Sequence, residues 1–483
     1  MKKSYQYIIR SISFGLFILT GFSSCKKYLE EPPSKTTSLV VTTTDQLSAL
    51  LNNYTQFYAE GNRTAIYSTD DYELPKSLYD ARPATFSSMA TIQFMLWDIP
   101  YLPDDTREGF WSGEYKKIFY ANMALDYVDK VTGPDADKAA IKADAHLIRA
   151  YSYWELANTY CLPYTDANKN EAGLPIKLST SFEEPFVRQP LSKVYELIES
   201  DITEALKTTV PLQQGAQVRH WRASKAGVNG FAARYYLNRN NYAKAITHAN
   251  AALTEYSTLV DYNSEMRYGR DGVITIDAGT AQQQTVTIKF PYTHDNQVDF
   301  TDMLGWKEFL YFRMLNYESW WYIPSQNLLN LYDQTNDLRY RYHIVEGYSY
   351  DRGMSKPSYN YPGYIFFFKD IIPSGPTVAE MLLIKAEALA RTNDVAGAMT
   401  AVNTLRAKRM LPGAWVNLSA INKDDAIKKV AEERRREMPF SQRWYDLRRY
   451  NNNEDPNDDV NLSKTFYPYT NSAVLSTQPV QSY

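Results

Sequence analysis

Small and aromatic residues recur at fixed intervals in one stretch of this chain, and they constrain its fold more than any other sequence feature. Ala233 and Tyr236 are followed by Ala245, Ala249 and Ala252. Residues three and four positions apart share one face of an α-helix, so the last three alanines form a stripe of small side chains. A second helix can approach such a stripe closely. The spacing therefore predicts two packed helices with a turn at 238–241.

This spacing is typical of a tetratricopeptide unit, in which two helices form a hairpin. A weaker copy lies within residues 378–409, where Ala386, Leu389 and Ala398 keep the register and residues 392–394 supply the turn. The two copies are separated by about four and a half periods of the usual repeat length. We therefore expect long insertions between them rather than a regular array.

Three further helices are predicted before the first unit. Apolar residues at steps of three and four indicate a helix over 111–128, ended by Gly133-Pro134. A second is expected over about 137–160. A third is expected to begin at Ser192, because a serine side chain can accept hydrogen bonds from the first N–H groups of a helix. The apolar face of this third helix is formed by Val194, Ile198, Ile202 and Leu206.

The chain changes character between the two units. Residues 286–290 alternate between apolar and polar side chains, which predicts a half-buried strand paired with residues 273–276. Tyr, Pro and Gly dominate residues 291–375, which we expect to be largely irregular loops packed on a rigid scaffold. The predicted fold is mainly α, a tetratricopeptide-like helical-hairpin scaffold with long loop-rich insertions and a small β-hairpin.

The N-terminal segment has the features of a lipoprotein signal. Basic residues precede an apolar stretch at residues 12–22 that is too short to cross a bilayer. Ser23-Ser24-Cys25 then resembles a lipobox, in which the cysteine is lipidated before cleavage. We expect residues 1–24 to be a signal peptide and Cys25 to carry the lipid anchor. The alternative is plain secretion, with Cys25 an ordinary thiol.

The rest of the chain is predicted to form a short tether and one domain. Residues 25–37 contain Pro32-Pro33 and show no apolar periodicity, which is typical of an extended linker. Residues 38–483 are long enough to bury a large core, and we expect them to form a single domain.

Composition excludes several classes of function. The formal net charge is −3, and loss of the basic signal would make it more negative, which argues against a nucleic-acid binder. The histidines are scattered, and no metal-binding, phosphate-binding or dinucleotide-binding motif is present. We expect no metal and no cofactor. We also expect no intrachain disulfide, because Cys161 has no partner once Cys25 is lipidated.

Two strings near the C-terminus carry a family resemblance. Glu432–Glu437 reads EERRRE and Gln442–Arg449 reads QRWYDLRR, and this pairing resembles the closing signature of the SusD/RagB family. The link between them, residues 438–441, is shorter than the common form and lacks its glycine. Further blocks similar to the family occur at residues 25–30, 324–332, 336–340 and 380–389.

The resemblance implies a surface-exposed outer-membrane lipoprotein of the Bacteroidota that captures glycans, or in some members peptides, and caps a TonB-dependent transporter of the SusC type. It implies no enzymatic activity. It also divides the domain into an N-terminal SusD-like part at about 38–255 and a C-terminal SusD/RagB part at about 270–483.

Aromatic side chains in the insertions are the candidate ligand-binding residues. A sugar ring stacks its apolar C–H face on an aromatic plane, and its hydroxyl groups need polar partners at the edge. Asp70, Asp71 and Arg82 are the candidate polar partners. The alternative for any of the tryptophans is that it fills the core. The aromatic candidates are Trp97, Tyr101, Trp306, Tyr311, Trp320, Trp321 and Tyr322.

The leading hypothesis is non-catalytic capture of an oligosaccharide or polysaccharide, with a transporter and outer-membrane lipid as partners. A RagB-like peptide-binding protein is the runner-up. A surface glycoside hydrolase would need two carboxylates converging on a cleft, and neighbours in sequence such as Asp70-Asp71 do not establish that. A purely structural adaptor would lack an exposed aromatic patch.

The arginine- and glutamate-rich C-terminal strings are predicted to be structural. Helical spacing of Glu and Arg forms ion pairs, and Arg443 or Arg448 can bind a loop carboxylate through two hydrogen bonds. Trp444 is expected in the core.

Overall fold

A computed structural model gives the fold, and helices dominate it. The structure describes residues 41–95, 109–181, 183–266, 271–289, 303–315, 322–351, 360–366 and 371–450. Its longer helices are α8 (Gly109–Val128), α9 (Asp135–Tyr160), α10 (Leu191–Ala205), α11 (Lys225–Asn238), α12 (Tyr242–Glu255), α18 (Val378–Arg391), α19 (Val395–Arg406) and α20 (Lys423–Glu437).

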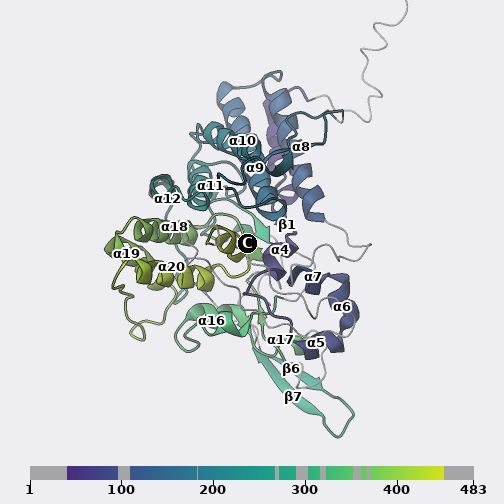
Figure 1. Ribbon diagram of the computed structural model, residues 1–483, viewed down its shortest axis with the longest axis vertical. Coiled ribbons are helices and arrows are strands. Elements are labelled where there is room, and N and C mark those ends of the chain that lie inside the picture. The colour runs from purple at the N-terminus through teal and green to yellow at the C-terminus, as the bar shows by residue number, and fades with distance from the viewer. Residues whose placement is uncertain are drawn as a thin grey trace, which may run out of the picture.

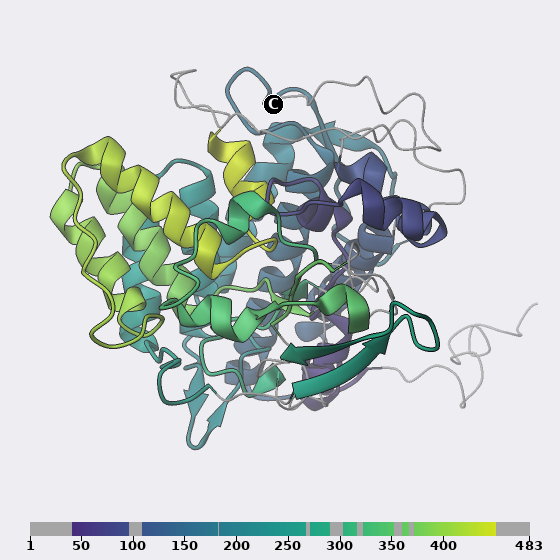
Figure 2. The ribbon, with the colours of Figure 1, turned by 90° about the horizontal axis from the view of Figure 1, so that it is seen from below.

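These helices stack in pairs along the molecule. Figure 1 shows α8, α9 and α10 in the upper part, α11 and α12 below them, and then α18, α19 and α20. Figure 2, turned by 90°, shows the last three helices in yellow-green as neighbours at one side. Each consecutive pair in this series is in contact, so the apolar faces cover one another. They form one large core cluster, a second cluster among α18, α19 and α20, and a third where α8 meets α9.

The helices predicted before the first tetratricopeptide-like unit are confirmed, with one correction at a terminus. Helices α8 and α9 pack together, and α10 packs on α9. Helix α10 begins at Leu191 after Pro190, so Ser192 lies inside the first turn and is not the N-cap. Proline fixes its backbone at a φ suited to a helix start, which explains why the turn begins there without a serine cap. Val194, Ile198 and Ile202 are fully buried, as their spacing predicts.

Both tetratricopeptide-like units are present at the predicted positions. The three alanines of α12 are completely buried, and this face allows the close approach of α11 and α18. Asn240 and Asn393 occupy the interhelical turns with φ of 54° and 69°, a left-handed conformation that asparagine tolerates better than most residues. Because α12 contacts α18 directly, the two units are neighbours in space despite the long insertion between them.

The insertion contributes short strands and one longer hairpin. Strands β6 (Asp271–Ile276) and β7 (Gln284–Lys289) pair antiparallel, with Asp271 opposite Lys289, as predicted. Figure 1 shows this hairpin extending beyond the helices. A small central sheet joins distant parts of the chain, with β8 (Met314–Leu315) between β1 (Ala59–Glu60) and β11 (Ile372–Pro373). The other strand pairs are β2 (Ala172–Pro175) with β3 (Arg188–Pro190), β4 (Gln213–Gln214) with β5 (Gln217–Val218), and β9 (Ile344–Val345) with β10 (Gly363–Tyr364).

The remaining described elements are short helices. Between residues 291 and 375, the described residues form only short elements, in keeping with the predicted loops. Among the helices that the structure describes, none combines the length and apolar character needed to cross a bilayer. The remaining helices are α3 (Thr44–Asn52), η1 (Tyr54–Gln56), α4 (Arg63–Tyr67), α5 (Lys76–Ala81), α6 (Pro83–Ser88), α7 (Thr91–Met95), α15 (Gln326–Leu329), α16 (Leu338–His343), α17 (Tyr348–Asp351) and α21 (Arg443–Tyr450).

The alanine stripe makes a first test. Ala249→Leu should lower the free energy of unfolding by about 1–3 kcal/mol, because the added methylene groups overpack the contact of α12 with its neighbours. Ala243→Leu, on the exposed face of the same helix, is the matched control and should change it by less than about 0.5 kcal/mol. Urea unfolding measures both, and equal effects of the two variants would contradict the assigned packing.

Candidate functional site

Asp70 and Asp71 lie in the loop between α4 and α5, where arginines of both C-terminal strings bind them. Arg435 donates from Nε to Oδ1 of Asp71 at 2.8 Å, and the backbone N–H of Phe440 donates to Oδ2 at 3.0 Å. Arg443 donates from Nε and Nη2 to the two oxygens of Asp70 at 2.7 and 2.9 Å. The predicted bidentate contact of Arg443 with a loop carboxylate is therefore confirmed.

Because Asp71 is buried, its contacts with the C-terminal strings fix the position of the loop between α4 and α5. Asp71 has no exposed surface, and a buried charge is stable only when it is paired and hydrogen-bonded. Burial alone would lower the pKa of Arg443, but the charge and hydrogen bonds of Asp70 raise it above its usual value. Both aspartates are thus held by the protein itself. To bind ligand hydroxyl groups as predicted, their carboxylate oxygens would have to accept hydrogen bonds from the ligand in addition to those from the protein.

The short link between the two C-terminal strings has a physical explanation. It contains no glycine, yet Phe440 has a φ of 63°, in the left-handed region that glycine adopts more easily. Two contacts hold this conformation: the N–H bond to Asp71, and the fully buried ring, which packs edge-on against Tyr322 at 5.4 Å. The aspartate loop and the link therefore stabilise each other.

The aspartate loop is paired along its length with a second segment. The N–H of Glu73 donates to the carbonyl oxygen of Ile323 at 3.1 Å, and the N–H of Ser325 donates to that of Asp71 at 2.7 Å. The Ser325 hydroxyl donates to the carbonyl oxygen of Asp70 at 2.6 Å. We call residues 70–73 and 323–326 together the loop platform.

One candidate aromatic segment adjoins the loop platform in sequence, and a second follows a helix that is hydrogen-bonded close to the platform. Trp320 and Trp321 directly precede Tyr322, the residue next to the platform. Helix α7 ends at Met95, just before Trp97, and the Ser68 hydroxyl donates to the carbonyl oxygen of Phe94 at 2.7 Å. Trp97, Tyr101, Trp320 and Trp321 themselves lie outside the described residues, as does Cys25.

The other three aromatic candidates lie in the core rather than at a surface. Tyr322 and Tyr311 are 0% and 1% exposed, and Trp306 is 6% exposed. Trp306 packs edge-on against Phe366 at 5.1 Å, and the Tyr311 hydroxyl accepts a hydrogen bond from Arg313 at 2.8 Å. Burial raises the pKa of Tyr311 to about 12. These positions favour the alternative that such residues fill the core.

Arg82 occupies a different position from the two aspartates. It lies at the junction of α5 and α6 and is half-buried, and its N–H donates to the carbonyl oxygen of Tyr79 at 3.0 Å. Nearby, the hydroxyl groups of Ser77 and Tyr361 lie 2.5 Å apart, which ties α5 to the segment before β10. Arg82 remains a candidate ligand contact.

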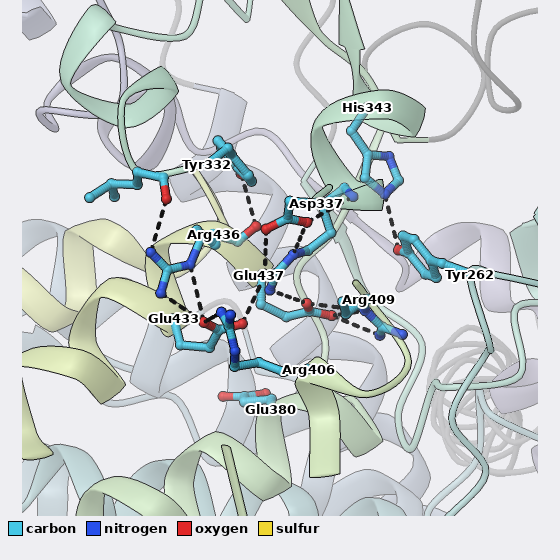
Figure 3. Close-up of polar contacts among 12 residues, drawn as sticks. Tyr262, Tyr332, Asp337, His343, Glu380, Arg406, Arg409, Glu433, Arg436 and Glu437 are labelled. Atoms are coloured by element: carbon cyan, nitrogen blue, oxygen red, sulfur yellow. Dashed lines mark hydrogen bonds and ion pairs between the residues drawn. The ribbon is translucent and has the colours of Figure 1, made fainter. Parts of the chain in front are cut away.

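Arginine and glutamate side chains of α20 form a buried network, as the sequence predicts. Glu433 accepts hydrogen bonds from Arg406 at 3.0 Å and Arg436 at 2.7 Å (Figure 3). Arg409 bridges Glu437 and Glu308, at 2.8 and 2.7 Å. Burial alone would raise the pKa of Glu433, but the surrounding arginines hold it well below its usual range. A carboxylate this strongly paired is a poor proton donor, so the network is structural.

Trp444 is also in the core, as predicted. It is 3% exposed, and its indole N–H donates to the carbonyl oxygen of Asn158 at 2.9 Å. Arg448 donates to the carbonyl oxygen of Cys161 at 2.6 Å and therefore binds backbone rather than a carboxylate at this contact. Helix α21 is thereby fixed to the end of α9.

Sequence reasoning missed Arg435 and Ser325 as residues that fix the loop platform. The spacing of EERRRE predicts pairing within one helix, but the partner of Arg435 is 364 positions away. No local pattern signals such a contact. The serine could have been suspected, because Pro324-Ser325 precedes the apolar residues of α15, and its hydroxyl also accepts from the N–H of Leu328 as an N-cap.

One family model matches an N-terminal part of the chain, and another matches a C-terminal part. The model described as "Starch-binding associating with outer membrane" matches residues 27–237, and the "SusD family" model matches residues 378–480. The SusD-like protein P38 of Formosa agariphila is 24% identical over 383 residues, covering 71% of this chain and 72% of that protein.

Solved structures agree on the fold. A SusD-like carbohydrate-binding protein from Bacteroides vulgatus has a TM-score of 0.54 and 18% identity, covering 85% of this chain and 84% of that one. A SusD-like protein from Bacteroides fragilis has a TM-score of 0.57 and 16% identity, covering 84% and 86%. A laminarin-binding SusD-like protein has a TM-score of 0.55 and 16% identity, covering 84% and 92%.

The fold and the sequence matches define the class as a tetratricopeptide-like helical protein of a carbohydrate-binding family. The chain belongs to the SusD/RagB family, as its two C-terminal strings indicate.

The aspartate loop provides a second test. Asp71→Asn should lower the free energy of unfolding by about 3 kcal/mol or more, because Arg435 and Arg443 would then share Asp70 as their only carboxylate partner at this largely buried site. Asp80→Asn is the matched control, since Asp80 pairs with Lys76 at a solvent-exposed site and should cost less than about 1 kcal/mol. Chemical unfolding compares the two, and a small effect at Asp71 would contradict the assigned importance of the contact.

His343 provides a test of pH dependence. Its Nδ1–H donates to the carbonyl oxygen of Ile365 at 3.0 Å. Its Nε2 accepts from the Tyr262 hydroxyl, also at 3.0 Å (Figure 3). Burial lowers the pKa of His343 to about 3. The unfolded chain binds this proton below about pH 6.5, so the stability contributed by neutral His343 is present above that pH and is lost as the pH falls toward 3.

The measurement is urea unfolding of the protein and of His343→Gln at several pH values. The stability difference between them should shrink by about 1.4 kcal/mol for each pH unit below about 6.5. A difference that stays constant between pH 7.5 and 5 would show that His343 is protonated equally in both states.

Proposed function

We propose that this chain is a non-catalytic nutrient-binding lipoprotein of the cell surface, which captures glycans and delivers them to a TonB-dependent transporter of the SusC type. The observation that carries the proposal is the match of residues 27–237 and 378–480 to SusD-type models. The first model's description as starch-binding, and the laminarin-binding protein among the structural neighbours, support a glycan as the ligand.

The loop platform is the proposed base of the binding site. Trp97 follows α7, which is hydrogen-bonded to Ser68, close to the platform. Trp320 and Trp321 precede Tyr322, which is next to the platform. Aromatic rings at such a position could stack on sugar faces, while Arg82 or nearby backbone groups bind hydroxyl groups. The buried contacts of Asp70 and Asp71 support a rigid base, which reduces the entropy lost on binding.

A non-catalytic role is supported by how the carboxylates of this region are used. A glycoside hydrolase needs two carboxyl groups on either side of the scissile bond, one of which donates a proton. Asp70 and Asp71 instead accept charge-assisted hydrogen bonds from arginines and are partly or completely buried. This arrangement favours binding over hydrolysis.

Membrane attachment would come from acylation of Cys25, with residues 26–37 as a tether. Each buried methylene of an acyl chain contributes about 0.8 kcal/mol, so several chains would hold the protein at the outer membrane. Delivery to a transporter also requires release of the ligand. We therefore expect affinities between micromolar and millimolar, about −8 to −4 kcal/mol.

The proposal is tested by affinity electrophoresis of the protein without its signal, in gels containing laminarin or starch. The protein should be retarded by at least one glycan, and Trp320→Ala combined with Trp321→Ala should weaken binding about tenfold or more, because stacking energy is lost. Trp415→Ala is the matched control. It removes a half-buried tryptophan that packs on Arg406 in another part of the protein, and it should leave retardation unchanged.

Reducing ends are assayed in parallel. New reducing ends would replace the capture proposal with a surface hydrolase. No retardation by any glycan, with binding to a peptide panel instead, would favour the RagB-like alternative.

A further inference from the structure

A groove with a volume of about 500 Å³ lies between α8 and the loop residues 177–181 and 183–187. On α8, Tyr115, Phe119 and Asn122 are four and three residues apart, so they share the helix face that lines the groove. Phe186 stands opposite and is 55% exposed. Its ring centroid lies 5.1 Å from that of Tyr115. Aromatic rings therefore form both walls.

Hydrogen bonds fix the loop that forms the second wall. The carboxylate of Glu184 accepts from the N–H of Leu178 and from the hydroxyl of Ser179, both at 3.1 Å. Asn122, which is fully buried, donates from Nδ2 to the carbonyl oxygen of Lys177 at 3.0 Å. The loop is thus tied both to itself and to α8. A groove built in this way exists before a ligand arrives, which lowers the entropic cost of binding.

The charges of the groove select a neutral ligand. Lys177 Nζ lies 3.5 Å from the carboxylate of Glu184 and donates to the backbone oxygens of Glu184 and Ser181 at 2.6 and 3.3 Å. These two opposite charges balance each other. Lys116, at the edge, is the other charged side chain among the described lining residues, and its Nζ lies 5.9 Å from the centroid of the Tyr120 ring. An ionic ligand would therefore find little complementary charge.

The chemistry of the walls suits a sugar better than a purely apolar group. Aromatic planes match the C–H faces of a sugar ring. The hydroxyl groups of Ser179 and Thr180 donate to Glu184 and Asp126, and their oxygens can still accept hydrogen bonds from the hydroxyl groups of a sugar. The volume falls within the range of about 300–1,000 Å³ that is usual for small-ligand pockets. Phe186 remains more than half exposed, so its ring is available for stacking.

We propose that this groove is a second saccharide-binding site, which binds a segment of a neutral glucan. This inference rests on the proposed function and extends it to a different part of the protein. Lys117 lies on the face of α8 opposite the groove and donates to the carbonyl oxygen of Ala59. Ala59 is near the start of α4, and the loop platform follows α4 in the chain. The loop platform is therefore on another side of α8 from the groove. Two sites on one protein increase the apparent affinity for a polymer that reaches both.

The variant Phe119→Ala/Phe186→Ala removes one ring from each wall of the groove. Tyr127→Ala is the matched control, because Tyr127 is a partly exposed aromatic residue of the same helix outside the groove. In gels containing laminarin or starch, the groove variant should bind about fivefold or more weakly than the unaltered protein, and the control should bind equally well.

A second readout is specific to the groove. The ring centroid of Trp111 lies 6.2 Å from that of Phe186, so a sugar in the groove should change the fluorescence of this tryptophan. Laminarin should still change the emission when Trp97, Trp320 and Trp321 are all replaced by alanine. A further Trp111→Phe substitution in that background should remove the change.

The outcomes separate this inference from the function on which it rests. If the unaltered protein is retarded and the groove variant behaves identically, the second site is wrong and glycan capture stands. If neither laminarin nor starch retards the unaltered protein, both are overturned for neutral glucans. If the groove variant keeps its retardation but loses a co-purifying transporter, the groove binds a protein rather than a saccharide.

Discussion

The contacts of Arg435 with Asp71 and of Arg443 with Asp70 hold the two ends of the described chain together. An ionised carboxylate as buried as that of Asp71 cannot be left without a counter-charge, so the loop that carries it must lie against the C-terminal strings. That requirement fixes the loop platform and the left-handed turn at Phe440. The proposed glycan site depends on the same contact, because its base is the platform.

Buried arginine–carboxylate pairs recur throughout the described C-terminal part and occupy many of its acidic residues. Glu433 and Glu437 are surrounded by arginines of three different segments, and Glu387 is bound by Arg449 at 2.5 and 2.6 Å. Burial alone would raise the pKa of Glu387, but Arg449 and its neighbours lower it well below the usual range. Such a carboxylate stays ionised and immobile. It contributes to the geometry of the fold rather than to proton transfer.

Local patterns were sufficient to predict the scaffold but not the surface. The alanine stripe of α12 and the asparagine turns follow from helix periodicity and backbone preference, so both tetratricopeptide-like units could be located to within a few residues. Whether Trp306, Tyr311 and Tyr322 are buried or exposed could not be predicted in this way. A large aromatic residue in a loop-rich insertion can pack in the core or form a binding surface. Only the three-dimensional packing distinguishes the two. The aromatic groove is hard to predict for a related reason. Phe186 follows no periodic pattern, and the spacing of its neighbours Trp111 and Tyr115 predicts only the apolar stripe of the helix over residues 111–128.

The contact of α12 with α18 has a consequence for how the protein folds. In a regular repeat protein each unit finds its neighbour directly along the chain, and folding can spread from one unit to the next. Here more than a hundred residues must be looped out before the second unit can cover the first. Closing such a loop costs entropy before any contact is gained, and contacts of this kind slow folding. If the protein is exported as proposed, the last quarter of the chain crosses the membrane after the N-terminal helices. Until then, the apolar face of those helices that α18 covers stays exposed.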